Sequence, residues 1–507
     1  VQQQTRDDNI DRHVQCDEIE TEDVGCQAPS KDAGIDNVMF KDQEIRNSRR
    51  FCRFVGKAGK LILRLLKDEA LDDVTSLANK STRSFSDSFT SLSLSKLAQK
   101  YQTQLCIVPK DRSDFLVTCH YVTESLAADL VDHGLVCLWN FSDLTSPEKI
   151  LICNARPSAA SILAAQTELV AGCDDGSLIL WDLNESDSSH ELIPWQNRDI
   201  SLRSPSFDSA YLRDEDATEK AETSAPVVDL KILGQNHGDI GNYSTSLFNY
   251  QIVALHQTGS LTVWTVLKGI RAVGRSSEMN NDLGLRLGSS IKLIRISVIQ
   301  PPKVITYTME LDKIGMFATC LAQEPQNHQN FLVGTDNGYI FRVAKFRESK
   351  SAPTTYEAYY DAPSSVLCLS FCPFEPSYFL AGFSDGLIHI YKLSFPKPLG
   401  VFRFDGSDLS AVNNVHWSPT NPCSFYSLYA NSFFASWDLK TSRMEPLAVD
   451  HMSGAIAFNV SREIAEETAY MTFVNTDGSV DIHRLKDQKK KNIAESCKRL
   501  IGIIERL

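Results

Sequence analysis

The residues of this chain that could do chemistry are an adjacent pair of acids and a close pair of cysteines. Asp174 and Asp175 are paired carboxylates of the kind used in general acid–base catalysis, but the sequence identifies no partner for them. Cys368 and Cys372 are separated by three residues, and no CxxC or CxxH set accompanies them, which disfavours a zinc site. Neither pair predicts a catalytic or metal centre.

The histidines and the short motifs lead to the same interpretation. The 11 histidines are dispersed, and His389 and His483 lie on or at the end of strand-like runs, where a structural histidine is more common than a ligand. No GxSxG, HExxH, P-loop or GxGxxG motif is present, and GKAGK at residues 56–60 lacks the spacing of a phosphate-binding loop. We expect a binding scaffold rather than an enzyme, with no cofactor and no metal.

The elements that position these residues are repeated hairpins. In LVAGCDDGSLILWDL (residues 169–183) an apolar strand enters a tight turn, and the next strand ends on Trp-Asp, a sequence cue of a β-propeller blade. Gly176 permits a positive φ where the chain reverses. The turn recurs at Gly134, Gly176, Gly259, Gly338, Gly386, Ser432 and Gly478. Five positions later stand Trp139, Trp181, Trp264, Val343, Tyr391, Trp437 and His483.

The spacing of these turns predicts the number of blades. Successive turn residues are 42, 83, 79, 48, 46 and 46 positions apart, whereas a four-stranded blade takes roughly 40–45 residues. Each wide interval is interpreted as one blade plus a long loop, or as a concealed extra blade. The sequence therefore predicts an all-β fold, a seven-bladed WD40-type β-propeller, with eight blades as the alternative.

The acids in the turns and the tryptophans at the strand ends are interpreted as structural residues of the blades. An acid in such a turn usually accepts hydrogen bonds from the backbone and so stabilises the turn. A Trp at the end of a strand fills the blade core. The predicted structural blade residues are Trp139, Asp175, Trp181, Trp264, Asp385, Trp437 and Asp477.

Composition limits the remaining classes. With 507 residues, of which 42% are hydrophobic, the chain is long enough for a propeller and a further segment. No apolar run approaches the ~18 residues needed to cross a bilayer. The net charge of −13 disfavours nucleic acid as a partner, and 13 cysteines, mostly in strand-like runs, suit a reducing compartment. The first residue is Val1, so truncation of the N-terminus is left open.

Residues 1–40 are predicted to be a disordered arm. They contain 3 basic and 10 acidic residues and few aromatic ones. Val and Ile are interspersed among Gln, Thr and acidic residues up to about residue 24, a pattern that can add as an extra strand to the sheet of a partner. A solvated tail is the alternative.

Residues 41–70 are predicted to contain an amphipathic helix. Residues 41–67 contain 9 basic and 2 acidic residues. One helical face would carry Phe51, Phe54, Val55, Ala58, Ile62 and Leu65. Gly56 and Gly59 each cost about 1 kcal/mol relative to Ala, so the helix needs a surface to pack on. A partner groove is favoured over an anionic membrane, and packing on the chain's own propeller is the structural alternative.

The rest of the chain is divided as follows. Residues 71–104 are predicted to be a Ser-rich linker that can contribute one closing strand, and residues 105–486 form the propeller. The acidic stretch 184–226 is expected to be a mobile surface insertion, while residues 291–299 and 303–311 are expected to be strands. Residues 487–507 are predicted to be a C-terminal amphipathic helix, which either packs on the propeller or docks on a partner. Its apolar face would carry Ile493, Cys497, Leu500, Ile501, Ile504 and Leu507.

Three stretches resemble a known family. VHWSPTNPCSFYSLYANSFFASWDL (residues 415–439) is similar to a segment of dynein intermediate chains in which Trp-Ser-Pro and a second Pro precede a strand ending in Trp-Asp-Leu. CLSFCPFEPSYFLAGFSDGLIHIYKL (residues 368–393) resembles the repeat beside it, and DRHVQCDEIETEDVGCQ resembles the arm of the cytoplasmic dynein-2 (intraflagellar transport) WD-repeat intermediate chains. The resemblance covers about residues 1–25 and 105–485. The chain departs from many WD repeats in having no Gly-His dipeptide.

This resemblance implies a non-catalytic intermediate chain of the cytoplasmic dynein-2 motor. Such a subunit scaffolds the heavy-chain tail and the light chains for retrograde intraflagellar transport and cilium assembly. It implies locations in the cytoplasm, the cilium, the ciliary base and the cytoskeleton. The implied partners are the dynein heavy-chain tail, light chains of the strand-binding dimeric, roadblock and t-complex types, and a second intermediate chain, with neither nucleic acid nor membrane insertion.

The resemblance also implies light-chain sites. Strand-binding light chains take an extended segment centred on Gln and often followed by Thr, for which Gln4-Thr5 and Gln15-Cys16 are the candidates. Cys16 departs from the expected Thr. The helical face between Phe51 and Leu65 would suit a roadblock-type dimer. The alternatives are an axonemal dynein intermediate chain, a WD40 substrate adaptor of a ubiquitin ligase and, disfavoured by the motif search, an enzyme that uses the propeller channel.

Overall fold

The described part of the chain begins at residue 83. The computed structural model describes residues 83–507 except for 95–97, 108–114, 126–129, 141–143, 145, 164–166, 196–197, 213–224, 234–249, 269–283, 301–315, 345–351, 358–363, 405–409, 442–444, 463–468, 486–492 and 505–507. These residues belong to one compact unit, Thr82–Leu507. The predicted arm (1–40) and amphipathic helix (41–70), with every predicted light-chain residue, lie outside the described residues.

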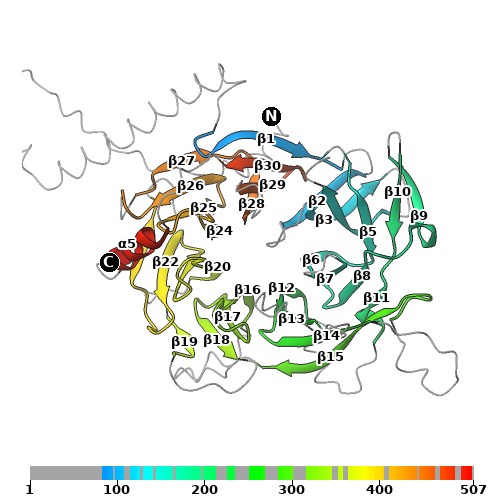
Figure 1. Cartoon of the computed structure of the whole chain (residues 1–507), viewed down its shortest axis with the longest axis horizontal. Helices are drawn as coiled ribbons and strands as arrows, with labels where there is room; N and C mark the ends of the chain where they lie inside the picture. Colours follow the sequence, from blue (N-terminus) through cyan, green and yellow to red (C-terminus); the bar gives the residue numbers. More distant parts are fainter. Residues whose placement is uncertain are drawn as a thin grey trace, which may run out of the picture. The chain divides into compact units, whose positions relative to one another are not determined.

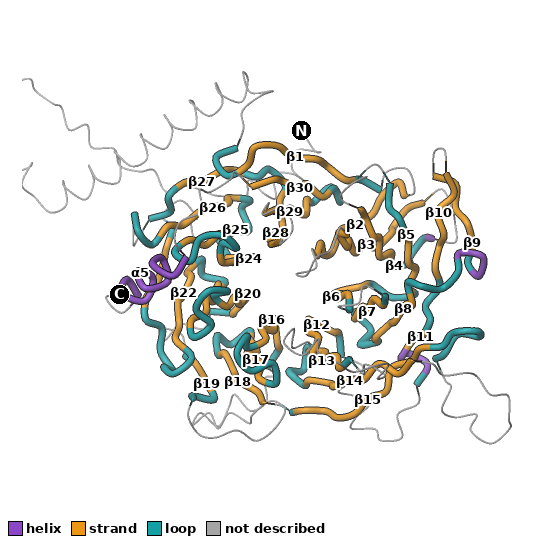
Figure 2. The backbone as a smooth tube through the Cα atoms, in the orientation of Figure 1, coloured by secondary structure: helices purple, strands orange, loops and turns teal. Residues whose placement is uncertain are grey.

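Within the described residues, the strands form seven sheets arranged around a ring (Figure 1). Six of the seven blades contain four antiparallel strands each, and one contains six strands. The first strand of a blade lies toward the centre of the ring and the fourth toward the rim (Figures 1 and 2). The prediction of an all-β, seven-bladed propeller is confirmed.

The blades are numbered here in chain order. Blade I contains β2 (Ala98–Ile107), β3 (Phe115–Ser125), β4 (Gly134–Asn140), β5 (Lys149–Cys153), β10 (Arg198–Arg203) and β9 (Glu191–Trp195). Blade II contains β6 (Pro157–Ile162), β7 (Glu168–Cys173), β8 (Leu178–Asp182) and β11 (Phe207–Asp208). Blade III contains β12 (Val227–Leu233), β13 (Gln251–His256), β14 (Leu261–Lys268) and β15 (Ile291–Ile299).

The second half of the ring is more regular. Blade IV contains β16 (Ala318–Gln323), β17 (Asn330–Thr335), β18 (Ile340–Ala344) and β19 (Thr355–Tyr356). Blade V contains β20 (Val366–Phe371), β21 (Tyr378–Phe383), β22 (Leu387–Lys392) and β23 (Gly400–Arg403). Blade VI contains β24 (Val412–Trp417), β25 (Ser424–Tyr429), β26 (Phe433–Asp438) and β27 (Ala448–His451). Blade VII contains β28 (Ala455–Arg462), β29 (Ala469–Asn475), β30 (Val480–Leu485) and β1 (Ser86–Leu92).

The turn between the second and third strands has the same backbone conformation in six blades. The five glycines concerned have φ of 83° to 85°, and Ser432 takes the same role with φ of 62°. Blade I differs, because Gly134 is the first residue of β4 and Asp132 has the positive φ of 62°. Gly134 is needed for another reason, since a Cβ there would lie 2.4 Å from Cys153 Sγ and from the backbone oxygen of Ala155.

The last blade is closed by the first described strand. β1 pairs antiparallel with β30, with Phe89 opposite His483 and Leu92 opposite Val480. The strands thus begin before residue 105, where the sequence analysis placed the start of the propeller. The Ser-rich composition that suggested a linker has a structural reason: β1 is an outermost strand, and Phe89 on it is 60% exposed.

The insertion between β8 and β11 of blade II also differs from its prediction as a mobile loop. Within it, β9 and β10 pair antiparallel with each other, and β10 pairs in parallel with β5, with Leu202 opposite Ile150. Ile200 and Leu202 are buried in the core of blade I, which explains why this part of the acidic stretch is structured. Two short 3₁₀ helices, η2 (Asp187–Ser189) and η3 (Ser209–Tyr211), flank the hairpin. The predicted strand at 291–299 is β15, whereas 303–311 lies outside the described residues.

The C-terminal helix α5 (Ile493–Ile504) packs on the propeller, which is one of the two outcomes expected for it (Figure 1). Leu500 and Ile504 are buried in the core shared by blades V and VI, beside Cys423 and Trp437. The Cys423 thiol donates a hydrogen bond to the backbone oxygen of Ser496 (3.5 Å). The apolar face predicted from the sequence is therefore the face that contacts the blades at these positions.

Neighbouring blades pack through a repeated contact between a Gly of one blade and a Val of the next. At Gly382 in β21, an added Cβ would lie 2.5 Å from Cys368 Sγ and 2.7 Å from Val412 Cγ1. No side chain fits there without displacing the next blade. The same contact joins Gly172 to Val227 and Gly334 to Val366.

Replacing Gly382 by Ala is expected to destabilise the propeller by about 1–3 kcal/mol, because overpacking forces its neighbours out of their rotamers. The matched control is Gly502→Ala in α5, where no atom lies within 4 Å of the added Cβ and the change should instead stabilise the helix by about 1 kcal/mol. Urea unfolding followed by Trp fluorescence measures both. Equal midpoints for the two variants would show that the contact between blades has no such role.

Candidate interaction surface

The residues first considered for chemistry do not form a reactive centre. Within the described residues, no group of three or more His, Cys, Asp or Glu side chains is placed to hold a metal ion. Cys368 and Cys372 are both buried, and burial raises the pKa of Cys372 to about 11. Burial raises the pKa of Cys368 as well, so neither thiol is a ready nucleophile at neutral pH. No helix among the described residues has both the length and the apolar character needed to span a membrane.

His389 and His483 are buried inside their blades. Burial lowers the pKa of His389 to about 4, and burial together with the Arg83 guanidinium lowers the pKa of His483 to about 4. His389 Nδ1 lies 3.2 Å from the Tyr391 hydroxyl, and His483 Nδ1 lies 3.1 Å from Ser86 Oγ. Both rings are neutral at pH 7 and hydrogen-bonded within the fold, which is how structural histidines behave.

Among the described residues, two blades contain a chain of hydrogen bonds from Trp through Thr to His that no sequence motif indicated. In blade III, Trp264 Nε1 donates to Thr262 Oγ1 (2.9 Å), which lies 2.9 Å from His256 Nε2. His256 Nδ1 lies 2.9 Å from the backbone oxygen of Ala225, which can only accept, so this nitrogen carries the proton and Thr262 donates to Nε2. The same order joins Trp139, Thr118 and His120 in blade I.

The tryptophans of the predicted blade set are all buried. Trp139 and Trp181 are each 1% exposed, Trp437 is 2% exposed and Trp264 is 4% exposed. Trp437 Nε1 donates to Ser427 Oγ (2.9 Å) within blade VI. These side chains fill the blades and do not reach a partner.

The turn acids Asp175 and Asp477 are exposed and Asp385 is half-buried, and each stabilises its own turn. Asp175 Oδ1 accepts from the backbone N–H of Ser177 (2.9 Å), and Asp477 Oδ1 accepts from that of Ser479 (2.9 Å). Asp385 Oδ1 accepts in the same way from the N–H of Leu387 (3.0 Å). An Asp carboxylate that accepts a hydrogen bond from the backbone N–H of the residue two positions later in the chain forms an Asx turn.

These turns form one face of the propeller, called here the turn face. In each turn, a backbone N–H donates a hydrogen bond to the backbone oxygen of the residue that precedes the innermost strand of the same blade. For example, the N–H of Asp174 donates to the oxygen of Arg156 (3.0 Å), and the N–H of Asp336 donates to that of Phe317 (3.0 Å). Phe317 is 49% exposed on this face. Loops held in this way lose little conformational entropy when a partner docks.

The β9–β10 hairpin is held by a buried arginine. The Arg203 side chain is 3% exposed, and its guanidinium donates to the backbone oxygens of Asp182, Leu183 and Glu185. It also donates to Asp187 Oδ1 (2.7 Å), and this bond lowers the pKa of Asp187. One side chain thus joins blade I to the segment that leaves blade II, and the sequence analysis missed it.

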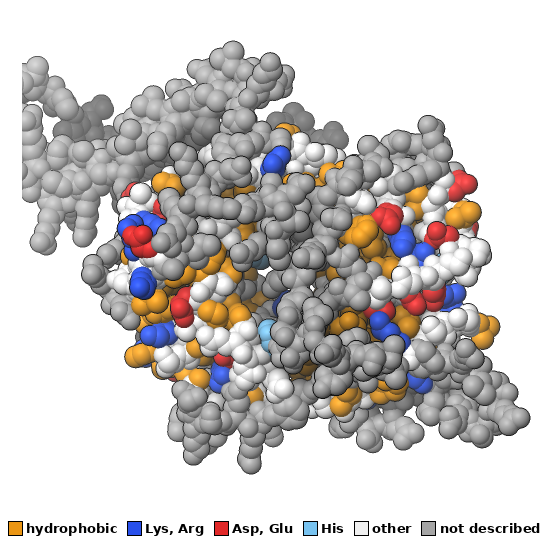
Figure 3. All heavy atoms as spheres, in the orientation of Figure 1, with side chains coloured by type: hydrophobic (Ala, Val, Ile, Leu, Met, Phe, Trp, Pro, Cys, Tyr) orange, Lys and Arg blue, Asp and Glu red, His pale blue; other side chains and the backbone are white. Residues whose placement is uncertain are grey.

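The surface of the propeller carries both signs of charge. Figure 3 shows basic and acidic side chains interspersed over the described part of one face. Exposed apolar side chains are also present at the rim, among them Phe89 on β1 and Ile296 on β15. A surface that mixes charged and apolar side chains resembles the composition of protein–protein interfaces.

The chain is similar in sequence to dynein intermediate chains. It is 27% identical over 511 residues to mouse (Mus musculus) cytoplasmic dynein 2 intermediate chain 1, which covers 95% of this chain and 50% of that protein. It is 23% identical over 339 residues to human (Homo sapiens) cytoplasmic dynein 2 intermediate chain 2, covering 62% of this chain and 54% of that protein. It is 22% identical over 324 residues to dynein axonemal intermediate chain 4 of Xenopus laevis, and this match covers 64% of this chain and 38% of that protein.

The extent of these matches is informative. The chain spans about half the length of the curated relatives that it matches. No family model matches the chain.

Proposed function

We propose that this chain is a non-catalytic intermediate chain of the cytoplasmic dynein-2 motor. The observation that carries the proposal is the extent of the match: similarity to a dynein-2 intermediate chain 1 covers 95% of the chain, whereas similarity to axonemal intermediate chain 4 covers 64% to 70%. The longer match includes residues before the propeller. The shared part is therefore larger than the blade repeats that many WD proteins have in common.

In this proposal the propeller is the part that holds the dynein heavy-chain tail. The ring has seven blades, hydrogen-bonded turns and a last blade that β1 closes, so we expect it to be rigid. A rigid surface loses little conformational entropy when a partner binds. The arm at residues 1–40 would recruit strand-binding light chains through Gln4-Thr5 and Gln15-Cys16, which brings two intermediate chains together. A t-complex-type light chain completes the set.

An axonemal intermediate chain is the second candidate, because axonemal relatives also match. Live imaging of the fluorescently tagged chain in ciliated cells separates the two. A dynein-2 subunit is expected to be present in the cytoplasm and at the ciliary base, and to move along the cilium toward that base. Stable incorporation into the axoneme, with no moving particles, would favour the axonemal candidate.

The predicted helix at residues 41–70 gives a direct test of light-chain binding. Replacing Phe54 and Ile62 by Asp should abolish binding of a roadblock-type light chain, because both lie on the predicted apolar face and a buried carboxylate there would be unpaired. The matched control is Lys60→Asp with Arg64→Asp on the opposite face. Pull-down of the purified light chain by the full-length protein measures the effect, and circular dichroism checks that the propeller is folded. Unchanged affinity in the Phe54/Ile62 variant would mean that the helix assignment is wrong.

A further inference from the structure

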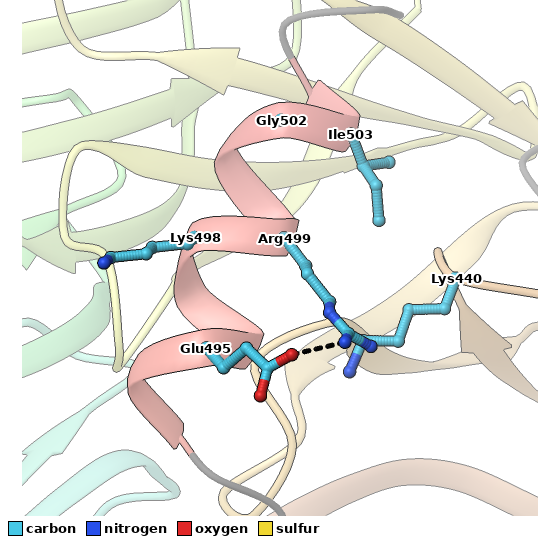
Figure 4. A pocket seen from close by; sticks show the side chains of 6 residues that line it. All are labelled: Lys440, Glu495, Lys498, Arg499, Gly502 and Ile503. Atoms are coloured by element: carbon cyan, nitrogen blue, oxygen red, sulfur yellow. Dashed lines mark hydrogen bonds and ion pairs between the residues drawn. The ribbon is translucent and has the colours of Figure 1, made fainter.

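A shallow basic groove lies along the exposed side of α5, where this helix packs against blades V and VI (Figure 4). Its volume is about 520 Å³. Lys440, which follows β26, forms one wall, and the other lining residues belong to α5. They are Glu495, Lys498, Arg499, Gly502 and Ile503. This site is called the α5 groove below.

The helix that forms the groove is firmly anchored. Leu500 is 0% exposed and Ile504 is 1% exposed in the core shared by blades V and VI. Lys440 Nζ donates to Ser496 Oγ (3.3 Å), which joins the wall of the groove to the helix. Because the inner face of α5 is fixed, its outer face is presented in one orientation, which lowers the entropic cost of binding.

The charge of the groove opposes that of the whole chain. Among the described residues that line it, three are cations, Lys440, Lys498 and Arg499, and one is a carboxylate, Glu495, which forms an ion pair with Arg499. Figure 4 shows Arg499 and Lys440 converging, while Lys498 extends to the other side of the helix. Two converging cations on a chain of net charge −13 favour an anionic ligand between or beside them.

The groove also offers an apolar contact. No heavy atom lies within 4 Å of the position that a Cβ at Gly502 would occupy, so the helix has an open notch there. Ile503, which is half-buried, borders this notch. An anion that also has an apolar side chain would therefore fit better than a small anion alone. The groove is shallow and elongated along the helix, which suits an extended segment of chain.

From these features, we propose that the α5 groove binds an acidic peptide segment of a partner protein. An apolar side chain of the peptide would lie over Gly502 and Ile503. Carboxylates on either side of it would pair with Lys498 and with the Lys440–Arg499 pair. Charge complementarity then sets the orientation of the bound peptide. The apolar contact makes the groove prefer this peptide over a polyanion that has no apolar side chain.

The test uses the full chain and a fluorescein-labelled peptide of Asp and Glu residues around one central Leu, with fluorescence anisotropy as the readout. Lys498→Glu should weaken binding by about tenfold. Gly502→Leu should abolish binding by filling the notch, while raising the unfolding temperature, because Gly is a poor helix former. The matched control is Lys397→Glu, an equal change of charge at an exposed lysine between β22 and β23, which should leave affinity unchanged.

A variant that binds less while being more stable cannot owe its loss of binding to unfolding. Affinity that is unchanged in both Lys498→Glu and Gly502→Leu would overturn the proposal. So would equal binding of a peptide in which the Leu is replaced by Glu, since this would show simple attraction between charges. Vesicles of phosphatidylcholine and phosphatidylserine serve as a further probe, and binding of vesicles instead of the peptide would assign the groove to a membrane surface.

Discussion

Deleting residues 1–93 is expected to abolish cooperative folding of the propeller. This deletion removes β1, which pairs with β30 along its length, and exposes the edge of blade VII. It also removes Phe85, which packs 4.7 Å from Phe434 between ring centroids, and the buried Leu92. Burial of such side chains stabilises a fold by about 1.5–3 kcal/mol each, so the loss approaches the 5–15 kcal/mol that is typical of a whole domain.

The matched control is deletion of residues 1–81, which ends where the compact unit Thr82–Leu507 begins. This shorter deletion should unfold with the same midpoint as the full chain. Differential scanning calorimetry and size-exclusion chromatography measure both variants. If the protein lacking residues 1–93 shows a single sharp transition at the full-length temperature, β1 does not close the ring.

Replacing Lys268 by Met is expected to destabilise the protein by about 3–5 kcal/mol, because it leaves a buried carboxylate without its partner. Glu168 in β7 is 3% exposed, and its Oε1 lies 2.5 Å from Lys268 Nζ at the end of β14. Burial raises the pKa of the nearby Asp182, and the negative charges of Glu185 and Glu168 raise it further. Met has an apolar side chain of similar length and lacks the ammonium group, which also lies over the Tyr250 ring at 5.4 Å from its centroid.

The double variant Glu168→Met with Lys268→Met isolates the cause of this loss. It removes both charges, and replacing a buried ion pair by apolar groups of similar size is often neutral or stabilising. Urea unfolding of the unmodified protein, the single variant and the double variant measures this difference. Equal stability of the single and double variants would contradict the account of the ion pair.

The blades could be predicted from the sequence because each one carries its own local signal. The signal is a turn glycine followed five positions later by a large side chain, and it can be recognised from residues that are close together in the sequence. Six of the seven turns adopt the expected positive φ. Blade I breaks the pattern at Gly134, whose small size is required by Cys153 and Ala155 and not by a turn. A glycine in a sequence does not reveal which of these two constraints applies to it.

The features that were missed depend on contacts between segments far apart in the chain. Arg203 binds backbone oxygens of residues 182–185, and no pattern in the sequence marks which carbonyls a guanidinium will meet. The blade III relay does leave a local trace, since Thr262 stands two positions before Trp264. In blade I the corresponding Thr118 and Trp139 are on different strands, so no fixed spacing could have indicated them.

The most direct test of the proposed function is affinity purification of the tagged full-length chain from ciliated cells, followed by mass spectrometry. We expect a cytoplasmic dynein-2 heavy chain, dynein light chains and a second intermediate chain in stoichiometric amounts. The variant lacking residues 1–93 should lose the heavy chain, because its propeller is not closed. Recovery of an axonemal heavy chain, or of a ubiquitin ligase with no dynein subunit, would contradict the assignment to dynein-2.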